Sequence, residues 1–134
     1  MGSGASSSKD NGFRHGEPDF EYDEIVECFR EGNGLLFRLE NKRTQEWAYF
    51  NDTKDFEMHV KIIFRRGSEL TALGNTNLEE DARGELMAYT VVFPGQTELF
   101  VQGHVEGFKS RIDALPLGDD YKAHRLRANK KKKR

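Results

Sequence analysis

The sequence predicts an all-β protein, an antiparallel β-sandwich of about eight strands. Apolar residues alternate with polar ones along much of the chain, which is the period of a half-buried strand. The clearest case runs from 57 to 65, where one face would carry Met58, Val60, Ile62 and Phe64 and the other Glu57, His59, Lys61 and Arg65. Turn residues separate the short runs of this kind, and 134 residues are enough for one domain.

The expected strands follow one another at short intervals. They cover Ile25–Phe29, Leu35–Leu39, Trp47–Phe50, Met58–Phe64, Leu70–Leu73, Leu86–Phe93, Glu98–Val101 and His104–Phe108. The turn signals between them are Glu31–Gly34, Asn51–Asp52, Arg66–Gly67, Gly74–Asn75, Arg83–Gly84 and Pro94–Gly95. Because large aromatic side chains in strand-like runs are usually internal, we expect Trp47, Phe64 and Phe100 to be mainly buried.

Composition and charge divide the chain into three parts. We expect residues 1–18 to be a flexible acylated leader, residues 19–120 the sandwich domain, and residues 121–134 a flexible basic tail. The net charge of −2 conceals an asymmetry, because the tail holds eight of the 21 Lys and Arg residues and no acidic residue. The rest of the chain carries 13 basic and 23 acidic side chains, a net charge of −10. An acidic body thus carries a basic tail.

Composition also excludes several classes of protein. Hydrophobic residues make up 36% of the chain, which is enough for one compact core. No apolar run approaches the roughly 20 residues that span a bilayer, and Met1–Asn11 lacks the apolar stretch of a signal peptide. The single cysteine, Cys28, excludes an internal disulfide. We therefore expect a protein that is neither transmembrane nor secreted.

The first six residues, Met1–Ser6, match the pattern for N-myristoylation, with Gly2 as the acceptor and Ser6 at the required position. A cloning remnant is the alternative interpretation, since Met-Gly-Ser also begins many expression tags. One myristoyl chain is a marginal anchor, with an association constant on the order of 10⁴ M⁻¹, so stable attachment needs a second signal. Ser3 cannot carry a palmitoyl thioester.

The basic tail is the remaining candidate for the second signal. A run of like charge can attract an anionic leaflet, at about 1 kcal/mol for each basic residue near the surface. The run consists of Lys130, Lys131, Lys132, Lys133 and Arg134. The alternatives are a solvated end and a nucleic-acid contact, and the latter is weakened because no aromatic residue for base stacking is interleaved with the run.

Catalytic and metal sites are not expected. Cys28 lies in a strand-like run, where a packed thiol is the common outcome, and none of the four histidines is placed to form a dyad with it. Acidic residues gather at expected loops, where carboxylate oxygens can bind calcium, but they lack the spacing of a calcium-binding loop. These groups are Asp52 with Asp55, Glu79–Asp81, and Asp119 with Asp120. We expect no cofactor other than covalent myristate on Gly2.

Seven short runs, taken together, resemble the small calpain-related myristoylated proteins of kinetoplastid protozoa. They are Asn33–Arg38, Trp47–Thr53, Phe56–Val60, Ala72–Gly74, Glu98–Gly103, Gly107–Ser110 and Asp113–Leu117. The resemblance covers about residues 22–121 and the leader. It implies a β-sandwich similar to calpain domain III, which follows the protease core in calpains, and attachment to the inner face of the plasma or flagellar membrane. It also implies a Cys at position 3 for a second acyl chain, where this chain has Ser3.

The sequence therefore favours a non-catalytic, membrane-associated structural or adaptor protein. The expected partners are inner-leaflet lipids and an unidentified membrane or cytoskeletal protein, and no nucleic acid. The first alternative is a soluble sandwich module that responds to calcium or to lipid headgroups through its acidic loops. The second is an enzyme that uses Cys28, which a cysteine-directed activity probe would reveal.

Overall fold

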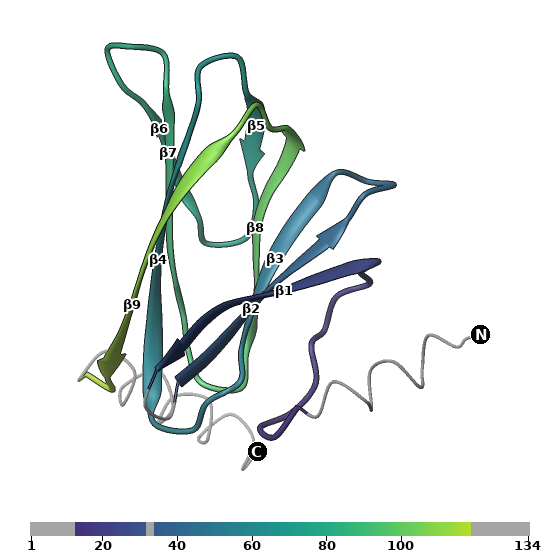
Figure 1. The fold of residues 1–134 in the computed structure, drawn as a ribbon, viewed down its shortest axis with the longest axis vertical. Coiled ribbons are helices and arrows are strands. Elements are labelled where there is room, and N and C mark those ends of the chain that lie inside the picture. Colours follow the sequence, from purple (N-terminus) through teal and green to yellow (C-terminus); the bar gives the residue numbers. More distant parts are fainter. Residues whose placement is uncertain (1–12, 32–33, 119–134) are drawn as a thin grey trace, which may run out of the picture.

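The computed structural model describes residues 13–31 and 34–118, and the described chain forms two antiparallel sheets (Figure 1). One sheet has five strands in the order β1-β2-β3-β8-β5, and the other has four in the order β6-β7-β4-β9. The strands are β1 (Glu24–Glu31), β2 (Gly34–Asn41), β3 (Glu46–Asn51), β4 (Phe56–Phe64), β5 (Glu69–Ala72), β6 (Asn77–Glu80), β7 (Leu86–Val92), β8 (Thr97–His104) and β9 (Phe108–Pro116). The predicted antiparallel β-sandwich is confirmed.

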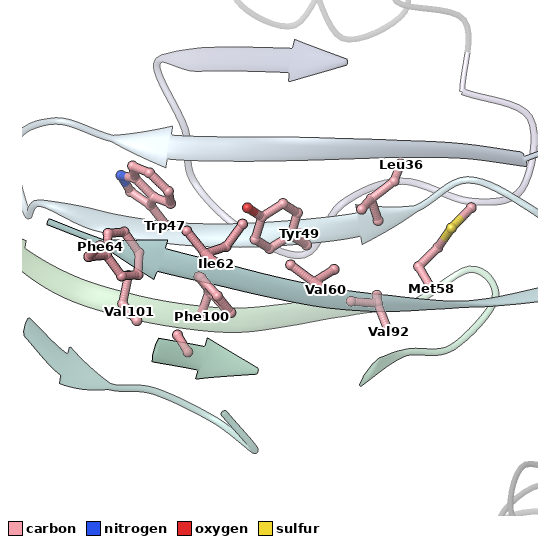
Figure 2. Close-up of a cluster of buried hydrophobic side chains, with 11 residues drawn as sticks. Leu36, Trp47, Tyr49, Met58, Val60, Ile62, Phe64, Val92, Phe100 and Val101 are labelled. Carbon is pink, nitrogen blue, oxygen red and sulfur yellow. The ribbon is translucent and has the colours of Figure 1, made fainter. Parts of the chain in front are cut away.

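The main core lies between the two sheets (Figure 2). β4 supplies its centre, because Met58, Val60, Ile62 and Phe64 all point inward and are fully buried, as the alternation predicted. The prediction for the aromatic residues is also confirmed, since Phe64 and Phe100 are 0% exposed and Trp47 is 8% exposed.

A second apolar cluster covers the opposite face of the five-stranded sheet. Leu39, Ala48 and Phe50 form its buried centre. The segment that precedes β1 lies over this face and contributes Phe13, Phe20 and Tyr22. β3 is therefore buried on both faces, with Trp47 and Tyr49 in the main core and Ala48 and Phe50 in the second cluster. Burial on both faces explains why its sequence is apolar without alternation.

Three of the expectations for strands were wrong: one expected strand is absent, and two strands, β6 and β9, were missed. The run His104–Phe108 is not a strand, because β8 ends at His104 and β9 begins at Phe108. The backbone has positive φ at Gly103 (135°) and Gly107 (146°), a region that favours glycine and allows the chain to reverse there. β6 was missed because Glu79 and Glu80 suggested a loop, yet they lie in the strand.

β9 was missed as well. Its nine residues are mostly exposed, and only Ile112 and Ala114 are partly buried against the main core. β9 is an edge strand that pairs with β4 alone, so most of its side chains need not be apolar. In the described residues, 13–31 and 34–118, no helix is long and apolar enough to cross a membrane.

Candidate functional site

One end of the sandwich holds both segments that connect the domain to its two termini. This end contains the β3–β4 connection, residues 52–55, and we call it the anchor end. The backbone N–H groups of Arg14 and His15 donate hydrogen bonds to Asp52 in this connection. The N–H of Gly118 donates to Glu57, which lies just after it. Figure 1 shows the start of the described chain and the end of β9 near the same end of the molecule.

Phe13 attaches the leader through its ring. The ring packs edge-to-face on Phe37 and on Phe50, with centroid distances of 5.3 Å in both pairs. Edge-to-face packing places the positive ring edge against the negative face of its neighbour, which adds to the gain from burial. The part of the expected leader that the structure describes, residues 13–18, therefore begins with an aromatic contact to the second cluster.

Asp52 holds the next two residues by their backbone. The N–H of Arg14 donates to Oδ1 of Asp52 at 3.0 Å, and the N–H of His15 donates to the same oxygen at 2.8 Å. The Asp52 residue is 2% exposed, so these donors replace the water that its carboxylate loses. Asp52 was expected only as a loop acid, and its role as the acceptor for the leader was missed.

The residues on either side of Asp52, Asn51 and Thr53, form hydrogen bonds of their own. The side-chain amide of Asn51 donates to the carbonyls of Phe56, at 2.8 Å, and Val92, at 2.7 Å. The hydroxyl of Thr53 donates to Oδ1 of Asn51 at 2.7 Å. These bonds join β3, β4 and β7, so the turn that carries Asp52 is fixed to both sheets. The turn itself was predicted from Asn51–Asp52, but this run does not indicate which segments its side chains bond to.

Glu57 holds the chain at its other boundary. Its Oε1 accepts a hydrogen bond from the Gly118 N–H at 3.2 Å, and its Oε2 lies 2.7 Å from Nε2 of His59. Nδ1 of His59 lies 2.7 Å from the hydroxyl of Tyr89. Desolvation and the nearby Glu57 raise the pKa of Tyr89, which keeps its hydroxyl protonated. The last described residue is thus tied to a short polar chain on the outer face of β4.

The predicted site residues themselves lie outside the described part of the chain. This holds for the acyl acceptor Gly2 and for the tail residues Lys130, Lys131, Lys132, Lys133 and Arg134. What the structure adds is the position of the residues that lead to them. His15, in the described part of the leader, bonds to Asp52, and Gly118, the last described residue before the tail, bonds to Glu57, both at the anchor end.

Cys28 is a semi-buried thiol, as expected. Its Sγ donates to the carbonyl of Val26 at 3.6 Å and lies 4.0 Å from Nη1 of Arg38. Burial raises the pKa of this thiol above its usual value, and Arg38 offsets only part of the shift. A raised pKa lowers the fraction of reactive thiolate at neutral pH. Arg38 also stacks on the Trp47 ring, 4.6 Å from its centroid, and bonds to Glu40 at 2.8 Å.

The acidic groups considered for calcium are engaged or dispersed in the part of the chain that is described. Asp52 accepts the leader amides, and Asp81 accepts the N–H groups of Arg83 and Glu85. Within residues 13–31 and 34–118, no three His, Cys, Asp or Glu side chains gather in a way that could hold a metal ion. Asp119 and Asp120 lie outside these residues.

Comparison of the chain with known proteins shows the family to which it belongs. Residues 13–117 match the family described as "Domain of unknown function (DUF1935)". No curated protein matches the sequence. Among solved structures, the chain is similar to SMP-1 (Small Myristoylated Protein) from Leishmania major, with 45% identity, a TM-score of 0.82, and coverage of 96% of this chain and 98% of that one.

A second solved structure supports the same grouping. It is described as a Leishmania major hypothetical protein, with 26% identity, a TM-score of 0.73, and coverage of 81% of this chain and 96% of that one. The family match covers most of the chain, and the identity to SMP-1 extends over nearly all of it. The chain therefore belongs to the DUF1935 family and, within it, to the small myristoylated proteins of kinetoplastids.

Proposed function

We propose that the protein is a non-catalytic structural or adaptor protein that is N-myristoylated at Gly2 and attached to the cytoplasmic face of the plasma or flagellar membrane. The name of its relative SMP-1 supports the acylation. The resemblance to the sandwich domain of calpains, a domain separate from their protease core, supports a role without catalysis. Inner-leaflet lipids and a membrane or cytoskeletal protein would be its partners.

The observation that supports the proposal is that the described residues next to both terminal segments lie at the same end of the sandwich. The leader is held at Asp52 by Arg14 and His15, and the tail follows Gly118, which is held at Glu57. Both segments therefore connect to the anchor end. The eleven residues from Gly2 to Gly12 span at most about 40 Å when extended. An acyl chain on Gly2 and the basic tail can thus reach one bilayer surface together.

The two signals are both needed on energetic grounds. A single myristoyl chain, with an association constant on the order of 10⁴ M⁻¹, leaves much of the protein free at low lipid. Three or four basic residues at the surface, at about 1 kcal/mol each, raise the affinity by on the order of 10². The net charge of −10 on residues 1–120 opposes this attraction. The proposal therefore requires the attraction of the tail to exceed this repulsion at close range.

The first test removes the acyl acceptor. Gly2→Ala should move the protein from the membrane fraction to the soluble fraction of its native cell, because no amide-linked myristate can form. Gly4→Ala is the matched control, since position 4 lies at a variable position of the pattern and should leave fractionation unchanged. The proposal fails if Gly2→Ala fractionates like the unmodified sequence.

The second test concerns the tail. Myristoylated protein should bind vesicles that contain phosphatidylserine better than neutral vesicles, and added salt should remove most of the difference. Replacing Lys130–Lys133 by Gln should have the same effect as salt. The control replaces four lysines of the body, Lys42, Lys54, Lys61 and Lys109, and changes the net charge equally. Equal binding to neutral and acidic vesicles at low salt would exclude the tail as a membrane signal.

A further inference from the structure

Three arginines gather at the opposite end of the sandwich from the anchor end. Arg65 and Arg66 follow β4, and Arg83 lies in the turn between β6 and β7. Together with Glu85 they line a cavity of about 570 Å³. Figure 1 shows the β4–β5, β6–β7 and β8–β9 connections at this one end. We call it the arginine end.

The stems of two of these side chains pass close to glycine residues. Gly107 has a φ of 146°, and a Cβ added there would lie 2.7 Å from Cδ of Arg65. Gly84 has a φ of 87°, and a Cβ added there would lie 3.0 Å from Cδ of Arg66. Each arginine stem therefore lies directly over a glycine, in space that no other residue type would leave free. Packing of the stem limits the positions of the guanidinium group and reduces the entropy that binding must remove.

Asp81 fixes the third arginine through the backbone. Its Oδ1 accepts hydrogen bonds from the N–H groups of Arg83, at 2.8 Å, and Glu85, at 2.9 Å. These bonds, above all the one from Glu85, lower the pKa of Asp81, so its carboxylate is ionised at neutral pH. The carboxylate orders the turn that presents Arg83 to the cavity. All three cationic side chains thus come from backbone positions that the fold constrains.

The charges around the cavity are unbalanced. Three guanidinium groups face one lining carboxylate, that of Glu85. Across residues 13–31 and 34–118, no carboxylate forms an ion pair with Arg65, Arg66 or Arg83, although Asp81 lies close to Arg83. Other arginines of the described chain do have such partners, as Arg38 does with Glu40 and Arg111 with Asp113. Three exposed guanidinium groups beside a single lining carboxylate, in an otherwise acidic body, indicate a site for an anion.

From this geometry we propose that Arg65, Arg66 and Arg83 bind a phosphomonoester group. Guanidinium groups suit phosphate because their planar N–H forks donate two parallel hydrogen bonds to its oxygens. The hollow is open to solvent, and its volume of about 570 Å³ leaves room for a phosphate and part of the molecule that carries it. A single phosphate would contact two or three of the arginines, and Glu85 would bond to a hydroxyl or amine elsewhere on the ligand.

A soluble organic phosphate and a phosphorylated lipid headgroup both carry this chemistry. The position of the site favours the soluble source. β4 has nine residues between the anchor end and Arg65, which corresponds to about 30 Å at ~3.3 Å per residue. A protein attached to the membrane by the anchor end would turn the arginine end toward the cytosol.

The test uses the full, ¹⁵N-labelled chain without myristate and follows its amide signals during titration. Inorganic phosphate and soluble inositol trisphosphate should produce saturable shifts at residues 65–67, 83–85 and 106–108. Arg66→Gln with Arg83→Gln should weaken this binding at least tenfold. The matched control, Arg43→Gln with Arg111→Gln, removes the same charge from exposed positions and should change the affinity less than twofold.

A third arm distinguishes the two sources. Vesicles of phosphatidylcholine with phosphatidylinositol bisphosphate should leave these amides unperturbed if the ligand is soluble. Shifts at the same amides with the vesicles would keep the phosphate site and assign it to a lipid headgroup. The proposal is wrong if neither the soluble phosphates nor the vesicles shift residues 65–67 and 83–85, or if both double variants weaken binding equally.

Discussion

Replacing Phe13 by Ala should release the leader from the domain without unfolding the sandwich. The Phe13 ring is partly buried on Phe37 and Phe50 and forms an edge-to-face pair with each. Burial of a Phe side chain stabilises by about 1.5–3 kcal/mol, and each aromatic pair adds about 0.5–1.5 kcal/mol. Because the ring is only partly buried, we expect a loss of about 2 kcal/mol in the free energy that holds the leader.

Hydrogen exchange at two amides measures this loss. The N–H groups of Arg14 and His15 are protected by Asp52 only while the leader is docked. A loss of about 2 kcal/mol should accelerate their exchange roughly 30-fold. Amides of β4 should be much less affected, because Val60 and Ile62 lie in the other core. Unchanged exchange at Arg14 and His15 would show that Phe13 does not hold the leader.

Three further substitutions or reactions test the core, the thiol and a glycine of β8. Trp47→Ala should lower the free energy of unfolding by about 3–5 kcal/mol in denaturant melts, whereas Leu115→Ala, at a residue that is 44% exposed, should cost less than about 1 kcal/mol. Alkylation of Cys28 at pH 8 should be slower in the folded than in the urea-unfolded chain, because the raised pKa reduces its thiolate fraction, and equal rates would contradict the burial. Gly103→Ala should lower the free energy of unfolding by about 1–3 kcal/mol or more, because φ is 135° and the added Cβ would overlap the carbonyl oxygen of Glu69. Gly118→Ala is the control, since its Cβ would meet only Oε1 of Glu57 at 3.9 Å, and it should be nearly neutral in thermal melts.

The sequence predicted the parts of the fold that one-sided burial controls. Alternation identifies β4 because its inward residues pack between the sheets and its outward residues contact solvent or polar partners. Alternation of apolar and polar residues does not identify β9, because this edge strand has little burial on either face. It also fails for β6, whose Glu79 and Glu80 are both exposed. Edge strands are defined by pairing with a distant segment, and local pattern does not contain that information.

The residues of the candidate sites also fall into those that the sequence could identify and those that it could not. Gly2 and the tail could be identified because lipidation and charge are properties of a short stretch of sequence. Asp52 could not, because its function depends on two backbone N–H groups 37 and 38 residues away. The arginine cavity could not either, since Arg65 and Arg83 are brought together by the pairing of β4 with β7. Residues separated in the sequence become one site only through the topology.

The two proposed sites should act independently of each other. The anchor end, where Asp52 bonds to Arg14 and His15, and the arginine end lie at opposite ends of β4, about 30 Å apart along the strand. Energies of changes at such separated positions add within about 0.3–0.5 kcal/mol. We therefore predict that Arg66→Gln with Arg83→Gln leaves the binding of myristoylated protein to phosphatidylserine vesicles unchanged, within about twofold, in sedimentation assays. Weaker vesicle binding by this variant than by the Arg43→Gln, Arg111→Gln control would mean that the arginine end contacts the bilayer, and that the sandwich lies along the membrane instead of standing on its anchor end.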